Sequence, residues 1–356
     1  MLDRKPLGYA QWLGVDPATA KGAVDGRLRM KFPLIDAISV DDLEIGATGV
    51  LTDASIPGIV NGWDLERGDV KLDVDAKRLH FDGKGRLLTE PATFKGDLNF
   101  GRGDERARIE GTWRLTRDVR REIGLGGAAF RRRLAGVAPT AFDIVVRPDK
   151  LYEIGFDADL TDATVLGQEI GWVKPKGALA HVSGRAVIQG ERALRVEDIA
   201  LAAGDLGVEA GVAFHPTTGA VSRVSIRRLK GAGHDLAAEI ALGATADDIR
   251  IYGRAADFRP LLEPGDGSDE KDAAAATPPH PSRIRVDLDK ARLMEGLTIS
   301  SLRADMTISG DWPSAFTAEG DYPGGTIRIR PDPEQSGGFV ATASEFGRLL
   351  EGAGVT

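Results

Sequence analysis

In the stretch Tyr152-Glu153-Ile154-Gly155-Phe156-Asp157-Ala158-Asp159-Leu160, apolar and polar residues alternate with a period of two. Successive side chains of a β-strand point to opposite faces of a sheet. The pattern therefore places the apolar set on one face and the polar set on the other, and it predicts a half-buried strand.

The same alternation recurs along the whole chain, at 70–74, 94–100, 206–214, 236–242, 284–288, 306–308 and 327–329. Turns with glycine and proline, such as Pro216-Thr217-Thr218-Gly219, separate these segments and indicate antiparallel hairpins. Helical patterns are confined to 116–125, 128–134 and 344–350. The predicted fold class is all-β: an elongated, twisted antiparallel sheet, curled into an open apolar groove, with short helical inserts.

Repeated phrases support a repetitive sheet. Residues 51–68, which begin Leu51-Thr52-Asp53-Ala54, align without a gap onto 160–177, which begin Leu160-Thr161-Asp162-Ala163. A weaker echo links three segments that carry apolar residues at their first, third and sixth positions: 38–45, 194–201 and 297–304. Because this spacing departs from strict alternation, it predicts a strand whose register shifts at a bulge.

The length of 356 residues exceeds one ordinary core, since domains usually run to roughly 100–200 residues. Residues 263–283 are rich in proline, glycine, aspartate and alanine, which predicts a flexible linker or loop. We therefore expect a first β repeat unit at 1–150 and a second at 151–262. Residues 284–356 are expected to begin a third β unit that the sequence does not complete.

Composition argues against several classes of function. A net charge of -8 disfavours nucleic acid as a partner. The absence of cysteine excludes disulfides and thiolate metal sites. No run approaches the roughly 20 apolar residues of a membrane-spanning helix. The five histidines are dispersed, and the chain has neither a Gly-x-Ser-x-Gly elbow nor a phosphate-binding loop. We therefore predict no enzyme activity, no catalytic residues, no cofactor and no metal.

Positive charge concentrates in one place, in two groups of arginines: Arg114, Arg117, Arg120 and Arg121, then Arg131, Arg132 and Arg133. The second group is a candidate site for anionic lipid headgroups or a membrane surface. Asp118 and Glu122 stand among the first group as local partners, so a solvated helix face is the alternative interpretation.

The repeated phrases also carry a family resemblance. Gly8-Tyr9, Gly14-Val15-Asp16-Pro17, 22–28, Phe32-Pro33-Leu34, the two Leu-Thr-Asp-Ala phrases and Gly171-Trp172-Val173-Lys174-Pro175 resemble the central region of AsmA-like proteins of the YhdP type. The last residues, 343–356, are similar to the short helix that precedes the family's next group of strands. These are strand and turn phrases without a signature chemical group.

The resemblance implies a periplasmic body of curled β-sheet and an inner-membrane anchor that lies outside this sequence. It also implies movement of phospholipid between the inner and outer membranes through a hydrophobic groove. The acyl chains would contact alternating apolar positions: Val70, Leu72, Val74, Ile154, Phe156, Leu160, Val208, Val212, Ile240 and Val286. Alternation alone does not separate these residues from those of a closed core.

Three other functions fit the same pattern. The first is a scaffold that assists outer-membrane assembly with envelope protein partners, as similarity to the related TamB group would suggest. The second is an adhesin or carbohydrate-binding β-sandwich, and the third is a β-helical hydrolase. Bound phospholipid would favour the conduit, and capture of an outer-membrane protein the scaffold. Glycan binding without turnover would favour the adhesin, and glycan hydrolysis the hydrolase.

Overall fold

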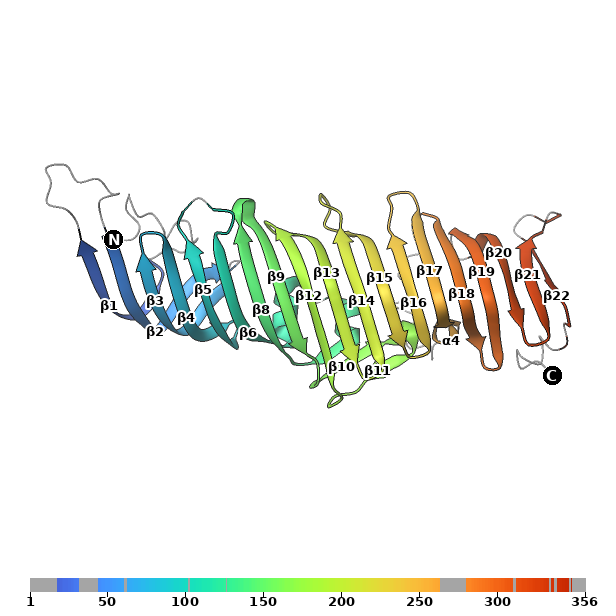
Figure 1. Cartoon of the computed structure of the whole chain (residues 1–356), viewed down its shortest axis with the longest axis horizontal. Coiled ribbons are helices and arrows are strands. Elements are labelled where there is room, and N and C mark those ends of the chain that lie inside the picture. The colour runs from blue at the N-terminus through green and yellow to red at the C-terminus, as the bar shows by residue number, and fades with distance from the viewer. Residues whose placement is uncertain are drawn as a thin grey trace. The chain divides into compact units, whose positions relative to one another are not determined.

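The computed structural model describes residues 18–31, 44–60, 63–101, 103–125, 127–262, 280–309, 312–332, 334–335, 338–345 and 347. Strands dominate this part of the chain, and nineteen of them belong to one large, twisted mixed sheet (Figure 1). The prediction of an all-β chain with a large twisted sheet and short helices is confirmed. By compactness the chain divides into two units, 1–163 with 185–192, and 164–184 with 193–356.

The strands up to Gln189 have the following bounds: β1 (Lys21–Lys31), β2 (Glu44–Val60), β3 (Trp63–Asp75), β4 (Arg78–Leu87), β5 (Glu90–Asn99), β6 (Ala107–Leu115), β7 (Leu134–Gly136), β8 (Ala138–Arg147), β9 (Leu151–Asp159), β10 (Ala163–Gly167), β11 (Trp172–Lys174) and β12 (Ala180–Gln189). Those after it are β13 (Arg192–Ala203), β14 (Leu206–Phe214), β15 (Val221–Gly231), β16 (His234–Ala241), β17 (Asp247–Asp257), β18 (Ser282–Met294), β19 (Leu297–Ser309), β20 (Trp312–Tyr322), β21 (Gly325–Pro331) and β22 (Phe339–Ala343).

Within each unit the strands pair in chain order, as a meander. The first unit runs β1 to β6, then β8 and β9, and every pair in it is antiparallel. The second unit runs β13 to β22, and its one parallel pair among the described strands is β17 with β18. The expectation of a wholly antiparallel sheet is wrong there. A long connection separates these two strands, so the chain can return to the end from which β17 started.

The helices are short: α2 (Arg117–Arg120), the π-helical turn η2 (Arg121–Leu125), α3 (Ala128–Arg133), η3 (Pro148–Lys150), η4 (Gln168–Ile170) and α4 (Arg259–Leu262). Thr116 caps α2, because its hydroxyl accepts from the Val119 amide. Helical structure predicted at 116–125 and 128–134 is confirmed. Most of 344–350 lies outside the described residues.

The structure describes only the last residues of the predicted linker. Of the segment 263–283, residues 263–279 lie outside the described residues, and Ser282 and Arg283 already belong to β18. The division into units at 1–150, 151–262 and 284–356 stays a prediction.

Bulges appear where the weaker repeat predicted them. Register shifts between Val196 and Ile199 in β13, and between Ser300 and Arg303 in β19. Asp198 and Ser301, the fifth residues of the two repeated segments, each have a φ of 52°. A positive φ at an extra residue is typical of a β-bulge. The third copy, 38–45, lies outside the described residues except for its last two positions.

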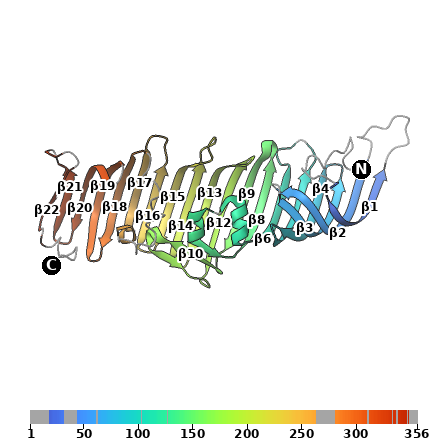
Figure 2. The ribbon, with the colours of Figure 1, turned by 180° about the vertical axis from the view of Figure 1, so that it is seen from behind.

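The stronger repeat forms the same hairpin twice. Ile56 faces Leu65 across β2 and β3, and the aligned residues Val165 and Lys174 face each other across β10 and β11. Beyond Leu51 the β2–β3 hairpin shifts register three times. Figure 2 shows the bent outer half of this hairpin lying across the sheet of the first unit.

Candidate functional site

The apolar residues of the first unit form rows that run from strand to strand. One row crosses β3, β4, β5, β6, β8 and β9 through the facing residues Leu72, Phe81, Gly96, Ile109, Ile144 and Ile154. A second crosses the same strands through Val70, Gly83, Phe94, Gly111, Phe142 and Phe156. Because neither row contains a polar residue, the strands share one continuous apolar face.

Two glycines in these rows leave room for the aromatic ring of the facing residue. A Cβ added to Gly96 would stand 2.8 Å from Phe81 Cζ, and one added to Gly111 would stand 2.6 Å from Phe142 Cζ. Each phenyl ring therefore occupies the space that a side chain at the facing glycine would need. At both positions, glycine lets the strands approach closely on the apolar face.

The bent hairpin covers one end of this face. Leu65 is buried against Val70, Leu87 and Ala92, and Trp113 packs on the same cluster. The Trp113 indole N–H donates to the Leu87 carbonyl at 3.3 Å, and its ring lies 5.6 Å from that of Trp63. The cover leaves Leu72, Val74, Ile154 and Phe156 half-buried, whereas Val70 and Leu160 are buried.

The second unit repeats this arrangement over more strands. Its outer row, as we call it, crosses β13 to β20 through Val196, Val212, Val224, Ile240, Ile249, Ile284, Met306 and Phe316. The middle row crosses β13 to β22 through Ile199, Ala210, Ile226, Ala238, Ile251, Val286, Ala304, Ala318, Ile329 and Ala341. The inner row crosses β13 to β19 through Leu201, Val208, Leu229, Leu236, Gly253, Leu288 and Leu302.

Exposure changes across the three rows. Every residue of the outer row is half-buried. In the inner row Leu229 and Leu288 are buried, at 7% and 1% exposed, whereas the other leucines and Val208 are half-buried. Leu288 belongs to a cluster with Val286, Ala256 and Ala291, against which Phe258 packs at the start of α4. The face is thus sealed at the Leu288 cluster beside α4 and more open along the outer row. Val212 and Ile240 lie in the open part, Val208 in the inner row, and Val286 in the sealed cluster.

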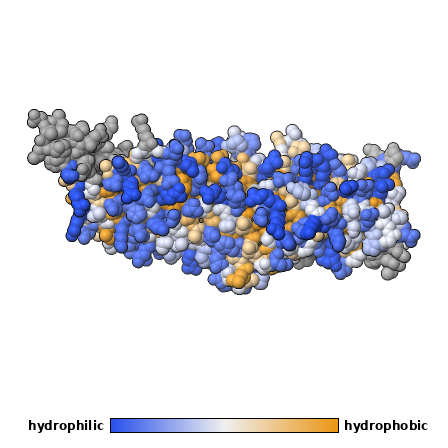
Figure 3. Space-filling model, in the orientation of Figure 1, coloured by the Kyte–Doolittle hydropathy of each residue, from blue (hydrophilic) through white to orange (hydrophobic). Residues whose placement is uncertain are grey.

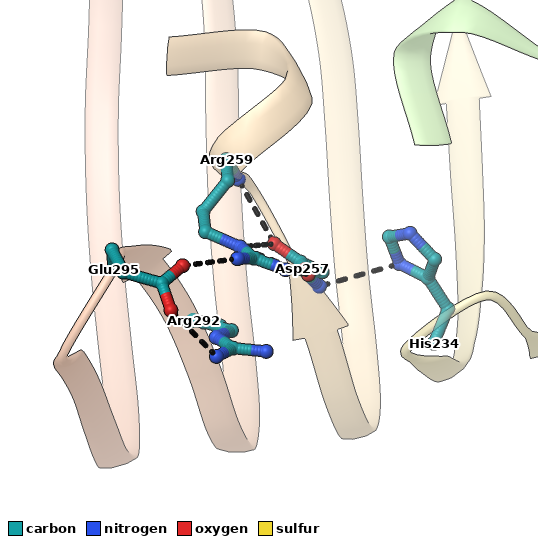
Figure 4. Close-up of polar contacts among 5 residues, drawn as sticks. All are labelled: His234, Asp257, Arg259, Arg292 and Glu295. Atoms are coloured by element: carbon teal, nitrogen blue, oxygen red, sulfur yellow. Dashed lines mark hydrogen bonds and ion pairs between the residues drawn. The ribbon is translucent and has the colours of Figure 1, made fainter. Parts of the chain in front are cut away.

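A polar cluster fixes α4 at the sealed margin (Figure 4). Arg259, at the start of α4, donates from Nη2 to Asp257 Oδ2 at 2.7 Å and from Nη1 to Glu295 Oε2 at 2.7 Å. Hydrogen bonding from Arg259 holds the pKa of Asp257 below its usual value. Arg292 Nη2 lies 3.8 Å from the other oxygen of Glu295. These charges join the ends of β17 and β18 to the helix.

His234 completes this margin from β16. Its ring is buried, and Nδ1 accepts from the Asp257 backbone N–H at 3.4 Å, which assigns the ring proton to Nε2. Burial lowers the pKa of His234, while the charge of Asp257 opposes that shift. The neutral imidazole is therefore the form that fits this position.

The opposite face of the sheet is polar. Charged residues there pair across strands, as in Lys95 with Glu110 at 3.2 Å and Arg283 with Asp305 at 2.6 Å. Figure 3, in the orientation of Figure 1, shows a surface on which hydrophilic residues predominate. Exposed pairs of this kind add little stability, about 0–1 kcal/mol each, so their main effect is to keep this face in water.

A shallow hollow of about 360 Å³ on the polar face is lined by Asp73, Asp75, Arg78, His80 and Asp97. His80 Nδ1 lies 3.1 Å from Asp97 Oδ1. Throughout the described ranges, no three His, Asp or Glu residues are grouped as metal ligands. In the same part of the chain, no helix has the length and apolar character needed to cross a bilayer.

The arginines of the two groups differ in their exposure to solvent. Arg131, Arg132 and Arg133 are exposed at the end of α3, and Arg121 pairs with Asp118 at 3.2 Å. Arg120 is instead buried, and its guanidinium donates to the carbonyls of Leu115 and Gly136, both at 2.9 Å, and of Leu134 at 3.4 Å. The interpretation of the whole first group as a solvated face is wrong at this residue, which ties α2 to β6 and β7.

Comparisons with known proteins leave the family open. No family model matches the sequence, and no match is found among curated proteins or solved structures.

Proposed function

We propose that this chain is a non-enzymatic lipid-binding segment, in which acyl chains lie on the apolar face of the sheet. The observation that carries the proposal is the outer row of the second unit, where eight facing residues on eight strands are all apolar and all half-buried. An apolar surface that protein does not cover completely favours an apolar ligand.

The dimensions suit acyl chains. Neighbouring strands lie about 4.8 Å apart, so the outer row is roughly 34 Å long. The hydrocarbon core of a bilayer, which holds two layers of acyl chains, is about 30 Å thick. The outer row therefore has room for more than one acyl chain end to end.

The energetics favour loose attachment. Full burial of a methylene contributes about 0.8 kcal/mol, so an acyl chain of about 16 carbons that buries half its surface gains on the order of 6 kcal/mol. The three rows contain no polar side chain that would hold one position along the chain. We infer that a bound lipid exchanges easily between neighbouring strands, which suits a conduit better than a storage site.

The resemblance to AsmA-like proteins extends the proposal to the cell. On that basis we propose a periplasmic location, a tether to the inner membrane outside this sequence, and movement of phospholipid between the inner and outer membranes. Arg131, Arg132 and Arg133, exposed on α3, are the proposed contacts for anionic headgroups.

Site-specific photo-crosslinking in cells tests the proposal. A photoreactive residue at Ile240, on the outer row, should capture phospholipid that mass spectrometry identifies, whereas one at the adjacent Glu239 should not. Phe156 and Asp157 form the same matched pair in the first unit. Equal capture at both members of each pair, or capture of envelope protein without lipid, would contradict the proposal, and the second result would favour the scaffold.

A further inference from the structure

The polar cluster beside α4 contains a buried histidine that the proposed lipid site does not use. His234 is 7% exposed, and its Nε2 atom is buried without a hydrogen-bond partner among the described residues. Its Nδ1 atom accepts from the Asp257 backbone N–H at 3.4 Å. Because histidine changes its charge near neutral pH, a buried imidazole beside charged groups is a candidate for a pH-sensitive contact.

Asp257 also holds α4 in place. Arg259 donates to Oδ1 of Asp257 through its backbone N–H at 3.1 Å and its Nε at 3.0 Å, and to Oδ2 through Nη2 at 2.7 Å. Both carboxylate oxygens are thereby bound to the first residue of the helix. His234 and α4 therefore share one contact residue at the end of β17, as Figure 4 shows.

The start of α4 lies over buried apolar residues. The Leu288 cluster consists of Ala256, Val286, Leu288 and Ala291. Phe258, the residue before α4, packs against this cluster, and so does the half-buried Leu236 of the inner row. η4 packs on α4, since a Cβ added to Gly171 would stand 2.7 Å from Pro260 Cγ. Movement of Phe258 and α4 would thus uncover apolar surface beside the inner row.

This arrangement fits only the neutral ring of His234. A proton on Nδ1 would place a second donor against the Asp257 N–H, while the N–H at Nε2 already lacks an acceptor. The positive ring would also compete with Arg259 for the Asp257 carboxylate. Burial lowers the pKa of His234 despite the attraction of Asp257, which agrees with this view of the site.

The other charged groups in this region have partners of their own. Glu295 pairs with Arg259 at 2.7 Å and with Arg292 at 3.8 Å, and Asp235, next to His234, accepts from Arg254 at 3.3 Å. Glu169 is exposed on η4. Asp257 is the group whose charge raises the pKa of His234. A proton on the ring therefore acts on the same carboxylate that holds the helix.

We propose that His234 is a proton-operated latch: when the ring binds a proton, Arg259 releases Asp257, Phe258 and α4 move off the sheet, and the Leu288 cluster is uncovered. A proton that binds the open form more tightly favours opening as the pH falls. An exposed histidine has a pKa of about 6.5, so the open population should rise below that pH by up to about tenfold per pH unit.

The consequence for lipid rests on the proposed function, whereas the latch itself does not. The Leu288 cluster adjoins the inner row, and the outer row is the more open part of the face. The latch would therefore regulate how far acyl chains reach from the outer row toward the inner row.

Cysteine labelling of the intact chain tests the latch, since the chain has no cysteine of its own. Ala291→Cys places a thiol in the Leu288 cluster, at a position that is 0% exposed. Ala203→Cys, at a position of β13 that is 5% exposed, is the matched control in the same unit. The ratio of the two labelling rates cancels the effect of pH on the thiol. Between pH 7.5 and 5.5 this ratio should rise about threefold to tenfold.

Two variants connect the rise to the polar cluster. His234→Asn keeps an acceptor oxygen near the place of Nδ1 but binds no proton, so the ratio should no longer depend on pH. Arg259→Met removes the contacts of α4 with Asp257 and Glu295, so Ala291→Cys should react fast already at pH 7.5.

Three results would overturn the latch. They are a flat ratio, including one in which both rates rise together as the whole unit unfolds, the same rise in the His234→Asn variant, and slow labelling at pH 7.5 in the Arg259→Met variant.

A second measurement, with the purified chain and phospholipid vesicles, tests the link to lipid. A photoreactive residue at Leu236 should capture more lipid at pH 5.5 than at pH 7.5, relative to one at Ile240. The same pH dependence at both positions would contradict the regulatory role. Absence of lipid at both positions would contradict the proposed function, while the labelling ratio would still decide on the latch.

Discussion

The close approach of strands on the apolar face of the first unit depends on Gly111, and Gly111→Ala tests this dependence. The new Cβ would stand 2.2 Å from the Thr93 carbonyl oxygen and 2.6 Å from Phe142 Cζ. To restore a contact of about 3 Å, β5 and β6 must separate by roughly 0.8 Å, and the phenyl ring must leave its position. Overpacking of a tight site typically costs about 1–3 kcal/mol, and the backbone contact here puts the expected loss near the upper value.

Gly49→Ala is the matched control. Gly49 also lies on the apolar face, but its added Cβ would meet only ordinary contacts, the nearest at 3.5 Å. Because glycine in a strand is less favourable than alanine, this change should be neutral or stabilise by up to about 1 kcal/mol.

Urea unfolding, followed by tryptophan fluorescence and circular dichroism, measures both changes. In the Gly111→Ala background, Phe142→Leu should restore part of the loss, because it relieves the ring contact and leaves the carbonyl contact in place. Similar stabilities for the two glycine variants would refute the view that close approach at Gly111 shapes this face.

Three further predictions concern the margins of the sheet. The free energy of unfolding should fall by up to about 1.4 kcal/mol per pH unit as the pH drops below about 6.5, because burial lowers the pKa of His234 and the unfolded chain then binds the extra proton. Urea titrations should show that His234→Asn reduces this loss of stability. His215→Asn, at an exposed site, should not reduce it. Arg120→Met should cost about 3 kcal/mol, since it leaves three carbonyls without their donor, and hydrogen exchange should rise first around α2 and β7. Leu288→Ala, in the buried cluster beside α4, should cost about 3 kcal/mol in thermal or urea unfolding, and Met306→Ala in the outer row about 1 kcal/mol; equal losses would contradict the difference in covering between these two positions.

Much of the fold follows from local pattern. The alternation at 152–160 corresponds to β9, Leu151–Asp159, because a strand projects its side chains with the same period of two. The bulges at Asp198 and Ser301 were predictable for the same reason, since an extra residue interrupts that period and leaves a mark in the sequence. The gapless alignment of the stronger repeat predicted a repetitive sheet, and its two copies form equivalent hairpins.

Other features leave no such mark. Alternation tells which residues share a face but carries no information on strand direction, so the parallel pairing of β17 with β18 was missed. It also does not tell what lies over the face, so Val70 and Val286 could not be separated from the half-buried Val212 and Ile240. Arg120 was missed because its carbonyl partners come from segments that meet only in the folded chain. No signal in its neighbourhood distinguishes it from Arg121.

The meander of the second unit sets a rule for how its length can change. Each of β14 to β17 runs opposite to its predecessor, so removal of two consecutive strands, such as β15 and β16, would bring β14 and β17 together with opposite directions. Removal of one strand would bring together two strands that point the same way, and a short turn cannot join them. A sheet of this kind therefore lengthens or shortens by whole hairpins, and each hairpin changes the apolar rows by two strand widths.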